Sequence, residues 1–102
     1  MDKNITNALS YQAKGTSFVG YIETTYDELV DKLGEPNYGP SGDGKVNCEW
    51  VLNVNGDICC IYDWKEKETP KDLYKWHVGG HSSRSLDYLK KTFNWETSKF
   101  VI

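Results

Sequence analysis

The chain has few of the features that mark secreted, membrane-spanning or nucleic-acid-binding proteins. Its 102 residues include three cysteines, Cys48, Cys59 and Cys60, and an odd number with two adjacent argues against a disulfide framework. No apolar run approaches the roughly 20 residues of a membrane-spanning helix, and the opening residues lack the apolar segment of a signal peptide. These absences predict a soluble protein in a reducing, intracellular compartment.

Arginine is scarce as well, because Arg84 is the only one in the chain. The formal net charge is −3, so we expect no attraction of the whole molecule to membranes and no direct binding of nucleic acid. Residues 1–63 contain 4 basic and 10 acidic side chains, whereas residues 64–102 contain 8 basic and 5 acidic ones. The C-terminal third can therefore tolerate an anionic partner.

The composition that remains is typical of a small folded protein. Hydrophobic residues make up 38% of the chain and charged residues 26%. The length predicts one domain, which we place at residues 17–102. The polar residues 1–16 are expected to form an N-terminal arm that is flexible, or a short strand at most.

Two helices are predicted from their end signals and their apolar spacing. Thr25 and Glu28 form a capping box before the apolar stripe of residues 26–33, and Gly34 can adopt the left-handed conformation that ends a helix. A second apolar stripe at helical spacing lies within residues 82–94.

Strands are predicted on both sides of a tight turn. Asn55-Gly56 is the strongest two-residue hairpin signal, because a type I′ turn needs positive φ at both positions. The hairpin pairs Val54 with Asp57, and alternation of apolar and polar residues continues along both of its strands. A third strand is predicted over residues 73–80.

The predicted fold is therefore an α+β two-layer sandwich with the order β-α-β-β-β-α. An antiparallel sheet of three to five strands carries two helices on one face, and residues 95–102 are expected to add a last short strand. The opposite face is expected to carry Glu49, Tyr62, Trp64 and His77, either solvated or buried against a second copy.

One stretch, WHVGGHSSRS at residues 76–85, suggests a site for phosphate or another anion. A glycine pair before a helix allows close approach to backbone amides, and the sole arginine opposes the helix dipole where it stands. The alternative is a simple turn with a serine cap and a solvated arginine. The candidate ligand-binding residues are Gly79, Gly80, His81, Ser82, Ser83 and Arg84.

Four aromatic residues on neighbouring strands form a second candidate site, for stacking on a base or for a protein interface. The alternative is ordinary packing within the sheet. They are Tyr62, Trp64, Tyr74 and Trp76.

Catalytic and metal chemistry are not indicated by any spacing in the chain. Asp63, Glu49, His77 and His81 are acid–base types, but they do not form a known triad or carboxylate pair. The three cysteines contain no Cys-x-x-Cys pair. We therefore assign no catalytic residue, no metal ligand and no cofactor, and interpret the protein as a binding protein rather than an enzyme.

Several motifs together resemble a group of small proteins encoded by tailed bacteriophages. The motifs are YDELVDKLGEPN, GDGKVNCEWVLNVNGDICCIYDWKE and YKWHVGGHSSRSLDYLKKTF, which run from about Thr25 to Phe93, roughly two thirds of the chain. The set is specific, although each motif alone is weak. The resemblance implies a phage accessory protein of the host bacterial cytoplasm and assigns no functional residue.

The expected function is to counteract host antiviral defence. The partner is then either a nucleotide-derived signal that the protein sequesters as a homo-oligomer, or a host defence protein that it inhibits. A small enzyme that degrades a nucleotide signal and a structural or accessory phage protein are the alternatives.

Overall fold

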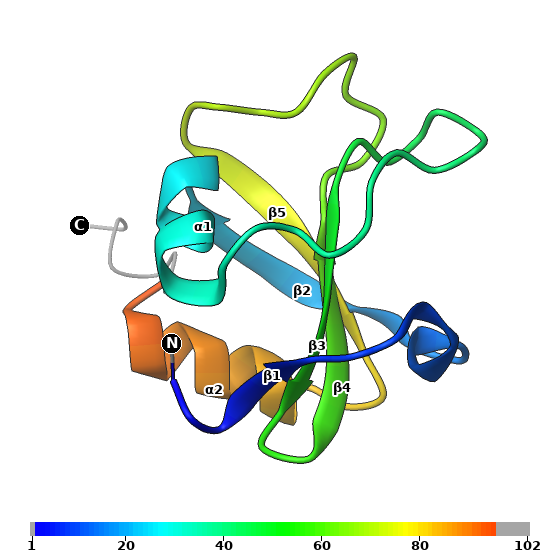
Figure 1. Cartoon of the computed structure of the whole chain (residues 1–102). Helices are drawn as coiled ribbons and strands as arrows, with labels where there is room; N and C mark the ends of the chain where they lie inside the picture. Colours follow the sequence, from blue (N-terminus) through cyan, green and yellow to red (C-terminus); the bar gives the residue numbers. More distant parts are fainter. Residues whose placement is uncertain (1, 96–102) are drawn as a thin grey trace.

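A computed structural model describes residues 2–95, which form one antiparallel sheet with two α-helices and one short 3₁₀ helix (Figure 1). The strands lie side by side in the order β1-β3-β4-β5-β2. The elements are β1 (Ile5–Asn7), η1 (Ser10–Ala13), β2 (Ser17–Thr24), α1 (Tyr26–Leu33), β3 (Glu49–Val54), β4 (Asp57–Tyr62), β5 (Tyr74–Gly80) and α2 (Arg84–Phe93).

Both α-helices cover the same face of the sheet, as the sequence predicts (Figure 1). Leu29 and Leu33 from α1 join Leu86 and Leu89 from α2 in one buried cluster. The sheet side of that cluster consists of Ile5, Ile22, Cys48, Trp50, Leu52, Val54, Cys59, Ile61, Trp76 and Val78. The predicted α+β two-layer sandwich is confirmed, and we call this helix-covered side the closed face.

Local signals place several elements where they were predicted. Helix α1 occupies the predicted residues 26–33, and the backbone amide of Glu28 donates to the Thr25 Oγ1 at 3.1 Å. Gly34 follows with a φ of 82°, and its amide donates to the carbonyl of Val30 at 2.8 Å. The cap and the glycine therefore fix both ends of this short helix.

The β3–β4 hairpin has the predicted turn and register. Asn55 and Gly56 have φ values of 56° and 94°, as a type I′ turn requires. Val54 pairs with Asp57, and the ladder continues without a shift to Glu49 and Tyr62. This register decides which side chains of the hairpin share a face.

The N-terminal arm contains a strand. Ile5–Asn7 pairs with β3 at one edge of the sheet, and the side chain of Ile5 is buried in the core. Just after β1, Ala8 packs on the opposite side of the sheet against Val51 and Cys60. The short-strand alternative therefore describes this part of residues 1–16.

The second helix matches its prediction except at its start. Leu86 and Leu89 are buried, and Asn94 ends α2 in the left-handed conformation with φ 60° and ψ 43°. Ser83 is already helical and makes no side-chain cap; the Oγ of Ser82 accepts from the amide of Arg84 at 3.3 Å instead. Of the strand predicted at residues 95–102, only Trp95 lies within the described residues. No helix within residues 2–95 is long and apolar enough to cross a membrane.

Candidate functional site

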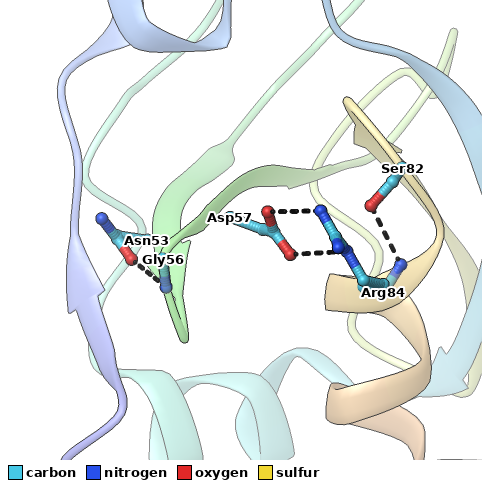
Figure 2. A network of polar contacts seen from close by, with 5 residues as sticks. All are labelled: Asn53, Gly56, Asp57, Ser82 and Arg84. Carbon is cyan, nitrogen blue, oxygen red and sulfur yellow. Dashed lines mark hydrogen bonds and ion pairs between the residues drawn. The ribbon is translucent and has the colours of Figure 1, made fainter.

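The predicted anion site at the start of α2 holds an internal ion pair. The Nε of Arg84 lies 3.3 Å from Oδ2 of Asp57, and its Nη2 donates to Oδ1 at 3.4 Å (Figure 2). Asp57 is the first residue of β4, so the β3–β4 hairpin brings its carboxylate to the helix start. A side chain of the protein itself therefore occupies the guanidinium edge that an anionic ligand would use.

The two glycines of this stretch serve sheet packing. Gly79 and Gly80 pair with β4 on one side and with β2 on the other, so they lie inside the sheet. A Cβ at Gly79 would meet the Sγ of Cys60 at 2.9 Å, and one at Gly80 would meet the carbonyl of Ser82 at 2.9 Å. Their backbone lies between two neighbouring strands. It is therefore not available to an anionic ligand in the way that the predicted site requires.

The remaining residues of the stretch border solvent. His81 and Ser83 are exposed, and the side chain of Arg84 is 78% exposed despite its pairing with Asp57. A hollow of about 400 Å³ lies beside the ion pair, between the hairpin tip and α2. Its lining residues are Val54, Asn55, Gly56, Asp57, Arg84 and Tyr88.

The four aromatic residues of the second predicted site are divided between the two faces of the sheet. Trp76 is fully buried on the closed face, where its Nε1 donates to the carbonyl of Thr24 at 3.1 Å. Tyr74 packs edge-on against Trp76 with a centroid distance of 5.1 Å. The prediction of one platform with all four rings is therefore wrong, and only Tyr62 and Trp64 remain on the side away from the helices.

A different set of rings gathers on that side, which we call the open face. His77 is central: its ring lies 4.9 Å from Tyr21, 5.5 Å from Tyr62 and 5.6 Å from Phe18, centroid to centroid. Trp64 completes the set, with its centroid 6.2 Å from Tyr62. We name Phe18, Tyr21, Tyr62, Trp64 and His77 the aromatic patch. Phe18 is 52% exposed, Tyr21 41% and Trp64 38%.

Sheet register brings these rings together. His77 on β5 pairs with Tyr62 on β4 and with Tyr21 on β2. A shift in register between Phe18 and Gly20 inserts an extra residue, so Phe18 points to the same side as Tyr21 three positions later. Phe18 and Tyr21 were not predicted as site residues, because the sequence does not show which strand pairs with β2 and strand alternation alone would place the two rings on opposite faces.

The ring faces of the patch are largely occupied from within. The Nζ atoms of Lys45 and Lys65 lie 5.8 Å and 5.7 Å from the centroid of Trp64, at cation–π distance. Tyr62 and His77 stack on each other with an interplanar angle of 28°. A base-stacking platform needs free ring faces, whereas this patch presents ring edges and lysine ammonium groups.

Burial controls the ionisable groups at the patch. It lowers the pKa of His77 below the ordinary value of 6.5, and the negative charges of Asp63 and Glu66 oppose this only in part. The Nδ1 of His77 is buried without a hydrogen-bond partner within residues 2–95. Burial raises the pKa of Glu49, the cross-strand neighbour of Tyr62. The patch thus favours a neutral imidazole over a charged one.

Asp63 has a structural role in this arrangement. Its buried carboxylate accepts hydrogen bonds from the backbone amides of Asn47 and Cys48 at 2.8 Å and 3.2 Å, and from the Asn47 side chain at 2.6 Å. These bonds fasten the chain before β3 to the end of β4. Asp63 is therefore a structural residue that anchors this loop.

The cysteines are free and buried. Burial raises the pKa of the Cys48 thiol to about 11, of Cys59 to about 12 and of Cys60 to about 11. Within the described residues, no group of three His, Cys, Asp or Glu side chains could hold a metal ion. The thiols therefore behave as small packing groups.

Comparisons with known proteins leave the geometry as the basis for interpretation. No protein-family model, no curated protein and no solved structure matches the chain. The aromatic patch and the Arg84–Asp57 pair are accordingly judged by their own contacts and exposure.

Proposed function

We propose that the protein binds another protein through the aromatic patch on its open face. The observation that supports this is the exposure of Phe18, Tyr21 and Trp64 together on one sheet surface. Single exposed apolar residues are ordinary, but contiguous ones mark interaction sites. Tyrosine and tryptophan are also the residues that most often carry the binding energy of a protein interface.

The border of the patch indicates the chemistry of the partner. Lys45 and Lys65 lie against Trp64, and Lys75 is exposed two residues before His77 on the same side of β5. An apolar centre with a charged rim is the usual anatomy of a protein interface. We therefore propose a partner surface with an apolar centre and acidic side chains around it.

The biological setting follows from the resemblance to proteins of tailed bacteriophages. On that basis the partner is a host defence protein, and binding in the bacterial cytoplasm inhibits it. Covering a functional surface of the host protein is sufficient for inhibition and requires no catalytic group.

Sequestration of a nucleotide-derived signal is the second candidate, and the exposed Arg84 beside its hollow favours it. Asp57 opposes it, because an anionic ligand must compete with a carboxylate that already holds the guanidinium. The exposed rings of Phe18 and Tyr21, in contrast, lie on the surface without an ion pair that a protein partner must break.

The test is capture of host proteins by the tagged protein from phage-infected cells, followed by binding measurements with the purified candidate. The double variant Tyr21→Ala/Trp64→Ala should reduce affinity at least tenfold. Leu73→Ala is the matched control, because Leu73 is exposed just before β5 and lies outside the patch. A host protein whose capture is equal for both variants would contradict the proposal.

The same preparation distinguishes the nucleotide alternative. The purified protein is heated, and the released small molecules are identified by mass spectrometry. Release of an intact nucleotide from the wild type, and its absence from Arg84→Gln, would favour sequestration over protein binding. An altered nucleotide would indicate an enzyme.

A further inference from the structure

Strand β2 is a long outer strand whose second edge is unpaired within residues 2–95. It borders the sheet over eight residues, whereas the other outer strand, β1, has three. Apart from its ladder to β5, no hydrogen bond to the backbone of residues 18–23 is found within residues 2–95. Free strand edges pair readily with another strand.

The composition of β2 does little to prevent such pairing. Proteins usually block an outer strand with lysine, proline or inward charges. β2 reads SFVGYIET, and its only charged residue is Glu23. The register shift after Phe18 distorts one end and leaves the run from Gly20 to Thr24 regular. The outer edge of β2 from Val19 to Glu23 is available for pairing, and its regular part begins at Gly20.

Charge is distributed unequally between the two ends of β2. Lys14 precedes the strand, whereas Glu23, Asp27 and Glu28 lie at or just after its other end. An antiparallel two-fold arrangement turns the acidic end of each copy toward the basic end of the other. With the axis at Tyr21, Glu23 faces Val19 of the second copy, so like charges do not meet.

We propose that β2 pairs antiparallel with β2 of a second copy, with Tyr21 opposite Tyr21. The two sheets then continue into one, with five strands from each copy. Phe18 and Tyr21 lie on this edge, so the two aromatic patches join into one surface across the axis. The dimer stands on the edge, the charges and the register, and it does not depend on the function proposed above.

Mass measurement by light scattering over a range of concentrations tests the dimer. The wild type should show twice the 11.7 kDa of a single chain. Tyr21→Lys should give the monomer mass, because it places two ammonium groups opposite each other at the axis. Trp64→Lys makes the same change within the patch but away from the edge, and should remain a dimer.

Cysteine substitution tests the register. Tyr21→Cys should form an intermolecular disulfide on oxidation, because directly paired residues have close Cβ atoms. Glu23→Cys should form far less. The native thiols are buried and give the background level. A wild type that is monomeric at every concentration, or a dimer that persists in Tyr21→Lys, would overturn the proposal.

These outcomes are separable from those of the proposed function. A monomer that still binds its host partner through Trp64 would remove the dimer and keep the function. A Tyr21→Lys-sensitive dimer whose host capture does not change in Trp64→Lys would keep the dimer and remove the function.

Discussion

Aromatic residues of the same kinds lie on both faces of the sheet, but they are buried on the closed face and exposed on the open face. On the closed face, Trp50 and Trp76 are fully buried, and each indole N–H donates to a backbone carbonyl, at 2.8 Å and 3.1 Å. On the open face, Trp64 is exposed beside two lysines. The difference teaches that residue type alone does not separate core from interface, whereas coverage by a second layer does.

Coverage of the open face is partial. Ala8 and Tyr38 pack over Val51 and Cys60, toward the β1 side of the sheet. The aromatic patch lies on the same face but toward the β2 edge of the sheet, on β2, on β5 and at the end of β4. The segments that shield one part of this face therefore leave the neighbouring part open, as a binding surface on a stable scaffold requires.

The largest contrast between the faces should appear on removal of a tryptophan. Trp76→Ala deletes a fully buried ring and should destabilise the protein by about 3–5 kcal/mol. Trp64→Ala removes a partly exposed ring and should cost about 1 kcal/mol or less. Urea unfolding followed by circular dichroism measures both. Equal losses would show that the open face is part of the core.

A smaller effect is expected at the buried carboxylate that anchors the loop before β3. Asp63→Ala leaves the amides of Asn47 and Cys48 without their acceptor, and should cost about 2–3 kcal/mol. Asp63→Asn retains one oxygen and should cost less. Thermal unfolding ranks the two variants. An equal loss for both would mean that the negative charge, rather than the hydrogen bonds, stabilises the loop.

Gly79 tests whether the close approach of β5 to Cys60 on the open face requires a glycine. Gly79→Ala brings a methyl group into the space of the Cys60 Sγ and should destabilise the protein by about 1–2 kcal/mol. Cys60→Ala in the same chain should restore part of the loss. Chemical denaturation of the two single variants and the double variant gives the coupling. Full additivity would contradict this packing role.

These results locate what the sequence alone can predict. The bounds of α1 and the β3–β4 register follow from local signals, since Thr25, Gly34 and Asn55-Gly56 each act on adjacent residues. The second helix likewise lies within the predicted residues 82–94 and ends at Asn94. Where one short stretch contains the whole cause, sequence reasoning is sufficient.

The candidate sites depended on contacts between distant segments and were predicted less well. Arg84 and Asp57 are 27 residues apart, so the arginine looked unpaired in the sequence. Phe18 joins the patch only through a register shift in β2, which depends on pairing with β5. Strand alternation, in contrast, correctly predicted Tyr62, Trp64 and His77 on the face away from the helices.

The pH dependence of stability should report the burial of His77 on the open face. Burial lowers the pKa of His77, so the unfolded chain binds a proton more readily than the folded one. The stability that this group contributes is therefore fully present above the unfolded pKa of 6.5, and it is lost as the pH falls below 6.5 and through the lower pKa of the folded state. Denaturant midpoints between pH 7.5 and about 5.5 measure the slope, and His77→Gln should flatten it.

Glu49 acts in the opposite direction, because burial raises the pKa of its carboxyl in the folded state. Protonation of that carboxyl favours the folded state, and it becomes important as the pH approaches the ordinary value of 4.5. A slope that is unchanged in His77→Gln would show that another group controls the stability in this range.

The smallest effect on stability is expected at Arg84, the residue on which the predicted anion site was based. Arg84→Gln removes an ion pair whose arginine side chain is largely exposed, so the stability should change by about 0–1 kcal/mol. Asp57→Asn breaks the same pair from the other side and should cost a similar amount.

If the pair only joins the hairpin tip to α2, both variants should bind the host partner as well as the wild type. If Arg84 instead holds an anion, Asp57→Asn should strengthen nucleotide binding, because it removes the competing carboxylate, and Arg84→Gln should abolish it. Isothermal titration with nucleoside phosphates measures the binding affinity of both variants. An anion site predicts opposite changes in affinity for the two substitutions, whereas a purely structural ion pair predicts no binding in either.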